Sequence, residues 1–113
     1  MLQEVITGSV AGTGAAINIS IGFQPSYVKV FNPNDAGTLY PTMEWINGMG
    51  AAKGFKTLKI ADNGATGNLS STFVATNGIS AYAGASSAAQ GFTIGADADI
   101  NVSAETVFWI AAR

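Results

Sequence analysis

Hydrophobic and polar residues alternate over much of this chain. Isoleucines occupy positions 17, 19 and 21 and are separated by Asn18 and Ser20. Successive side chains of a β-strand point to opposite faces, so this period of two predicts a half-buried strand. The same alternation across 97–105 predicts a strand with one buried face and one wet face. The following segment, 106–111, is apolar on both faces, which is typical of a strand covered on both sides or lying at a subunit contact.

Turn-forming residues separate several further segments of strand character. Strands are expected at 2–10, 26–32, 40–46, 55–60, 71–76 and 79–83. Asn63-Gly64 and Asn77-Gly78 favour tight hairpin turns, and loops are expected at 32–37 and 83–90. No segment has the pattern of a helix longer than two turns.

A chain of 113 residues has room for one hydrophobic core. Short strands at this spacing are typical of sandwiches and barrels. We therefore predict an all-β fold, an antiparallel β-sandwich or barrel of about eight short strands, with residues 1–113 forming a single domain. The N-terminal residues lack the basic start and apolar run of a secretory signal, and no stretch approaches a membrane-spanning length.

The chain carries unusually little charge. Charged residues make up 11% of the sequence, whereas about a quarter is usual in a soluble domain. Interspersed charge normally keeps a free monomer in solution, so a weakly charged surface predicts that neighbouring subunits cover part of it. The net charge of −2 gives no broad positive field, which argues against general nucleic-acid binding.

The residue types that most often perform catalysis are missing. There is no His and no Cys, which removes the usual general base at neutral pH and the usual zinc ligands. Gly12-Thr13-Gly14 lacks the third glycine and the strand-turn-helix setting of a dinucleotide site. We expect no enzymatic activity, no catalytic residues, no cofactor and no bound metal.

Acidic residues leave two alternatives open. The segment Asp97-x-Asp99-x-Asn101 opens like a calcium-binding loop but lacks the glycine and the final glutamate of an EF-hand. A calcium site of another kind at a subunit boundary remains an alternative to a solvated strand face. A two-carboxylate glycosidase could draw on Glu44, Asp97, Asp99 or Glu105, although the sequence indicates no pairing among them.

Lys53, Lys56 and Lys59 form the basic cluster of the chain, in a segment flanked by glycine. Such a cluster is either solvated surface or a small contact patch for an acidic partner. We treat the three lysines as candidate partner contacts.

The large aromatic residues are the other candidates for contact. Trp45, Phe108 and Trp109 are expected in the core or at an interface. A sugar-binding face is the alternative for Trp45 and the neighbouring aromatics, namely Tyr27, Phe31 and Tyr40.

Three stretches of the sequence together resemble small virion proteins of tailed bacteriophages. They are Gly-Phe-Gln-Pro at 22–25 leading into Tyr-Val-Lys-Val at 27–30, Met-Glu-Trp-Ile-Asn-Gly-Met at 43–49, and Gly-Phe-Thr-Ile-Gly at 91–95 with the terminal Trp-Ile-Ala-Ala-Arg at 109–113. These stretches span most of the chain and look like markers of a fold, not of an active site.

The resemblance implies an all-β capsid decoration, or cement, protein on the capsid surface of the virion, made in the cytoplasm of the host bacterium. Its implied partners are the major capsid protein and further copies of itself, as a homotrimer, with no nucleic acid and no membrane. The implied action is mechanical, because bridging capsid proteins adds interface that must be lost before the shell opens. A tail-fibre or receptor-binding module that contacts a host glycan is the alternative.

Overall fold

The computed structural model describes residues 5–34, 40–62 and 67–113, and within these the side chains of all residues except 59–62 and 67–68. In these ranges eight strands form one antiparallel sheet, which confirms the predicted all-β class and strand number. The strands are β1 (Val5–Ala11), β2 (Ile17–Ser20), β3 (Tyr27–Phe31), β4 (Thr42–Ile46), β5 (Lys53–Asp62), β6 (Gly67–Tyr82), β7 (Gly91–Ile94) and β8 (Thr106–Ala112). A 3-10 turn, η1 (Asn47–Met49), follows β4.

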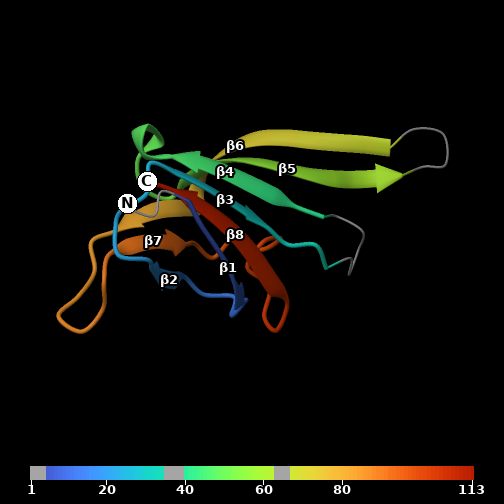
Figure 1. Cartoon of the computed structure of the whole chain (residues 1–113). Coiled ribbons are helices and arrows are strands. Elements are labelled where there is room, and N and C mark those ends of the chain that lie inside the picture. The colour runs from blue at the N-terminus through green and yellow to red at the C-terminus, as the bar shows by residue number, and fades with distance from the viewer. Residues whose placement is uncertain (1–4, 35–39, 63–66) are drawn as a thin grey trace.

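The strand order is β1-β8-β3-β4-β5-β6-β7-β2, so the first two strands of the chain form the two edges of the sheet. The sheet curls into a half-barrel (Figure 1). Ile6 of β1 and Ile19 of β2 pack against the same core, because the curl brings both edges toward it. β5 and β6 extend furthest from the rest of the sheet, as a two-stranded ribbon (Figure 1).

The hydrophobic core fills the inside of the curl. Trp109 packs edge-on against Phe92, with ring centroids 5.3 Å apart, and the indole N–H of Trp45 donates to the carbonyl of Gly50 at 2.8 Å. The buried cluster consists of Val28, Val30, Met43, Trp45, Ile79, Phe92, Ile94, Ile100, Val107, Trp109 and Ala111. Each strand thus turns one face to the core, as the alternating patterns at 17–21 and 26–32 predict.

The strand predicted at 97–105 is wrong, because the segment between β7 and β8 is a loop of turns. Asp97 Oδ1 accepts hydrogen bonds from the backbone N–H groups of Asp99 and Ile100, at 2.9 and 3.1 Å. An aspartate that binds the backbone just after it favours a turn over an extended chain. Ile100 and Asn101 are both 1% exposed, although a strand on a half-buried sheet would point neighbouring side chains to opposite faces.

The predicted hairpin turn at Asn77-Gly78 is also wrong, because β6 runs unbroken through both residues. Asn77 has a φ of 60°, and the Gly78 N–H donates to the Ala52 carbonyl at 3.1 Å. A Cβ on Gly78 would lie 2.2 Å from the Lys53 carbonyl oxygen, so only glycine fits this close approach. The pair therefore makes an irregularity at which β6 passes from pairing with β5 to pairing with β7.

One further loop prediction is confirmed, and one predicted turn lies outside the described residues. The segment 83–90 is a loop that contains one isolated bridge, between Ala85 and Ala88, as predicted. The predicted turn at Asn63-Gly64 lies outside the described residues. No helix in the described part of the chain is both long and apolar enough to cross a membrane.

Candidate interaction surface

The face of the sheet turned away from the core carries large apolar side chains over β1, β8, β3, β4, β5 and the N-terminal part of β6. Phe55, Phe73 and Phe108 are 43%, 52% and 41% exposed, and Ile46 is 51% exposed. We define the apolar outer face by the side chains that alternate with core residues on these strands, namely Val5, Tyr27, Phe31, Ile46, Phe55, Phe73, Phe108 and Ile110.

Strand register makes these side chains neighbours. Phe31 pairs with Phe108 across β3 and β8, and their rings stack with centroids 6.3 Å apart and planes 19° apart. Phe55 pairs with Phe73 across β5 and β6. Single exposed apolar residues are normal in proteins, whereas several exposed apolar residues gathered on one face often mark an interaction site.

Two open grooves flank the ring of Phe31. One has a volume of about 360 Å³ and runs between β3 and the start of β4, where Pro33, Tyr40 and Pro41 line it. The other has a volume of about 420 Å³ and lies over β1 and β8, lined by Ser9 and Phe108 among others. The Phe31 and Phe108 pair therefore forms a ridge on the apolar outer face with a groove on each side.

Polar side chains interrupt the face along the pairing of β3 with β4. The Tyr27 hydroxyl donates to Glu44 Oε2 at 2.8 Å. Partial burial of the phenol, and then the hydrogen bond to Glu44 and its negative charge, raise the pKa of Tyr27 to about 12. Lys29 is the cross-strand partner of Glu44, yet its ammonium forms no ion pair with any described residue.

Lys53 and Lys56, two of the three lysines predicted as one contact patch, have different surroundings. Lys53 Nζ donates to the carbonyl of Ala75 at 3.1 Å near the surface. Lys56 instead forms ion pairs inside the molecule, and its side chain is only 13% exposed. Residues three apart on a strand point to opposite faces, which is why spacing along the sequence was misleading here. The side chain of Lys59 lies outside the described residues.

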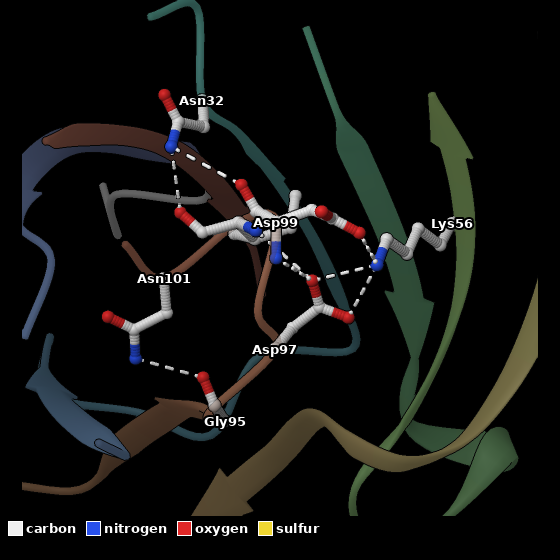
Figure 2. A network of polar contacts seen from close by, with 7 residues as sticks. Asn32, Lys56, Gly95, Asp97, Asp99 and Asn101 are labelled. Carbon is white, nitrogen blue, oxygen red and sulfur yellow. Dashed lines mark hydrogen bonds and ion pairs between the residues drawn. The ribbon is translucent and has the colours of Figure 1, made fainter. Parts of the chain in front are cut away.

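Lys56 bridges the carboxylates of Asp97 and Asp99 (Figure 2). Its ammonium lies 2.9 Å from the Asp97 carboxylate and 2.6 Å from Asp99 Oδ2. Burial of the amine lowers the pKa of Lys56, but the hydrogen bonds and charges of Asp99 and Asp97 outweigh burial and raise it. This ion-pair network ties the loop after β7 to β5.

Two asparagines hold the same loop from its other side (Figure 2). Asn32 Nδ2 donates to the carbonyl of Ile100 at 3.0 Å and to Glu105 Oε1 at 2.8 Å. Asn101 Nδ2 donates to the carbonyl of Gly95 at 2.9 Å, and its Oδ1 accepts from the backbone N–H of Thr13. Buried polar groups of this kind are costly unless satisfied, so the network has a structural role.

The acids weighed for calcium binding or hydrolysis all have partners within the chain. Asp97 and Asp99 hold Lys56, Glu105 accepts from Asn32, and Glu44 accepts from Tyr27. Within the described ranges there is no group of three or more metal-binding side chains that could hold an ion. The ammonium of Lys56 provides the positive charge between Asp97 and Asp99.

The aromatic candidates divide between the two faces of the sheet. Trp45 is 1% exposed and Trp109 is 7% exposed, so both tryptophans belong to the core. Phe108 precedes Trp109 on β8 and therefore points the other way, onto the apolar outer face. Sequence reasoning missed Ile46, Phe55 and Phe73, which become neighbours only once the strand order is known.

Comparison of the chain with protein-family models, with curated proteins and with solved structures gives no match.

Proposed function

We propose that this chain is a structural protein of a bacteriophage virion, and that it decorates the capsid. In this role it binds the outer surface formed by the major capsid protein and stabilises the shell. The observation that carries the proposal is the apolar outer face, which lies on a chain with only 11% charged residues. A face of this kind is suited to contact with protein and is poorly suited to permanent contact with water.

The resemblance to small phage virion proteins supports the choice of a capsid as the assembly. A decoration protein needs no reacting groups, because its effect comes from contact area repeated by symmetry over the shell. Each bound copy favours the closed shell by mass action, since contacts made only in the closed state must be lost on opening. The paired carboxylates and amides described above have roles within the fold, which is consistent with a non-catalytic protein.

The copy number of the chain in purified virions tests this function. Quantitative mass spectrometry of virions would give the molar ratio of this chain to the major capsid protein. We expect a ratio set by the lattice sites of the capsid, with hundreds of copies or more as the order of magnitude for a symmetric shell. A few copies for each particle, at one vertex or at the tail tip, would refute the decoration role and favour a receptor-binding module.

A further inference from the structure

The centre of the apolar outer face has an unpaired positive charge beside a negative one. Lys29 on β3 and Glu44 on β4 are direct cross-strand partners. Lys29 is half-buried among apolar neighbours, including its β8 partner Ile110, and its ammonium lacks an ion-pair partner among the described residues. Glu44 accepts one hydrogen bond, from Tyr27, and a carboxylate can accept several. Both charges are thus available to a molecule that covers this face.

We infer that the apolar outer face packs against the same face of a second copy of this chain, about a two-fold axis that runs parallel to the strands between β3 and β4. The inference goes beyond the proposed function, because it assigns the apolar outer face to contact between copies of this chain and leaves contact with the major capsid protein to another surface. A two-fold contact uses the same surface on both subunits, so that surface must be complementary to itself.

The register of the strands makes the charges on this face complementary to those on the same face of a second copy. A two-fold axis between β3 and β4 places each β3 opposite the β4 of the other copy. Lys29 and Glu44 occupy the same level along these strands. Lys29 therefore faces Glu44 of the partner subunit, and Glu44 faces Lys29 of the partner subunit. Two reciprocal ion pairs form at the centre of the contact, and each half-buried lysine gains a carboxylate.

The same axis places two pairs of apolar positions opposite one another, whereas Phe31 and Phe108 lie opposite threonines of the partner subunit. Ile110 on β8 and Phe55 on β5 flank the central pair at the same level, one on each side. The axis exchanges these two positions, so Ile110 of each copy packs on Phe55 of the partner subunit. One row further along, Tyr27 and Ile46 are cross-strand partners and exchange in the same way. Stacked sheets lie about 10 Å apart, a distance that large side chains from both faces fill.

The size of the face sets the expected strength. The strands from β1 to β6 in the sheet order span roughly 24 Å at about 4.8 Å for each spacing, and three rows of side chains cover about 20 Å along them. Two such faces bury at most about 1,000 Å² in total, the lower limit for a specific interface. Because the core lies inside the curl, the outer face is convex, and contact concentrates on the strands next to the axis. The expected dimer is therefore weak, with a dissociation constant in the micromolar range as an order of magnitude.

Sedimentation equilibrium of the full-length protein, from about 10 to 1,000 μM, tests the inference without any virion. We expect a reversible equilibrium between monomer and dimer. Lys29→Glu and Glu44→Lys each place like charges opposite one another twice, so each should weaken self-association by about tenfold or more. Monomer at every concentration, or a dimer or trimer that neither substitution weakens, would overturn the inference.

Mixing the two variants separates contact between copies from effects inside one copy. A heterodimer of the Lys29→Glu and Glu44→Lys proteins pairs opposite charges at both positions, so it should form more tightly than either homodimer. Damage to the fold of either variant would not be repaired by mixing. Failure of the mixture to associate would reject the Lys29 to Glu44 contact, with Lys29→Gln and Glu44→Gln as milder variants if a charge reversal unfolds the chain.

Ser87 provides the matched control, because it is exposed in the loop at 83–90, away from the apolar outer face. Ser87→Glu and Ser87→Lys should leave self-association unchanged, alone and as a mixture. Tighter association of that mixture than of either Ser87 variant alone would show attraction by net charge and would count against the inference. A dimer of the isolated chain does not depend on virion copy number, so this inference and the decoration role can fail separately.

Discussion

The outer side of the sheet has two parts that differ in chemistry although they belong to the same layer. Over β8, β3, β4 and β5 it exposes aromatic and aliphatic side chains such as Phe55 and Phe108. Over β2, β7 and the C-terminal part of β6 it carries Asn18, Ser80 and Thr93. Thr93 Oγ1 donates to Asn18 Oδ1 at 2.7 Å, so this second part forms its own polar contacts.

The difference between the two parts shows what each is suited to meet. Short polar residues on a strand keep their hydrogen bonds with water and with each other at little cost. Stacked aromatic rings gain free energy when another apolar surface removes them from water. Since both parts have the same core behind them, folding alone does not require the apolar residues. The predictions that follow test this contrast, from the largest expected effect to the smallest.

The two neighbours Trp109 and Phe108 give the largest contrast. Trp109→Ala should lower the free energy of unfolding by about 3 to 5 kcal/mol, because it empties a core site next to Phe92. Phe108→Ala should cost only about 1 kcal/mol in the monomer, because its ring is 41% exposed and its main contact is stacking with Phe31. Urea unfolding at low protein concentration measures both, and equal losses would contradict the assignment of the two faces.

Lys56→Met tests whether an internal charge behaves differently from charge on the apolar outer face. It leaves Asp97 and Asp99 without their cation, so stability should fall by about 2 kcal/mol, less than for a fully buried pair because the Asp99 side chain is 32% exposed. Self-association of the folded fraction of this variant should equal that of the original protein. A loss of association without a loss of stability would show that Lys56 is a contact residue after all.

Phe55→Asp and Ser20→Asp place the same charge on the two parts of the outer side. Phe55→Asp should weaken self-association by about tenfold, because it buries a carboxylate in the proposed contact. Ser20 is exposed on the edge strand β2, in the polar part, so its replacement should leave association as it was. Sedimentation of both variants measures the difference, and equal effects would remove the distinction between the two parts.

Alkaline pH should give the smallest change, a loss of folding stability through Tyr27 on the apolar outer face. The folded pKa of Tyr27, about 12, lies above that of an unfolded tyrosine, about 10. The protonated form is therefore favoured by folding, and its stabilising effect is complete below pH 10 and is lost as pH rises toward 12. The raised pKa of Lys56 acts in the same direction in the same alkaline range.

Absorbance titration of the phenols checks that statement directly. Tyr27→Phe should remove the component that titrates near pH 12 and leave the others. Removal of a component near pH 10 instead would show that burial and Glu44 do not raise the pKa of Tyr27 in solution.

The sequence predicted the strands well where apolar and polar residues alternate only because one face of the strand packs on the core. The segments at 17–21 and 26–32 alternate because one face of each strand packs on the core, and both are strands. Alternation at 97–105 has another cause, because Asp97 and Asn101 are buried and bind backbone groups of a loop. A pattern of polarity does not distinguish a solvated carboxylate from one that holds a turn.

The apolar outer face could be predicted only in part. The apolar run at 106–111 indicated a strand covered on both sides or at a subunit contact, and its outer residues Phe108 and Ile110 do lie on that face. Phe55 and Phe73 belong to separate strands, so their proximity depends on the register of β5 with β6. The sequence did not predict that β6 runs unbroken through Gly78, because the dipeptide Asn-Gly usually forms a turn.

A cryo-electron microscopy map of the intact virion, at a resolution that shows side chains, tests the central claim most directly. The account predicts that another protein surface covers Phe55, Phe73 and Phe108, while the polar part over β2 and β7 is open to solvent. A map in which the aromatic residues of β5, β6 and β8 face solvent, and the polar part makes the contacts, would contradict it.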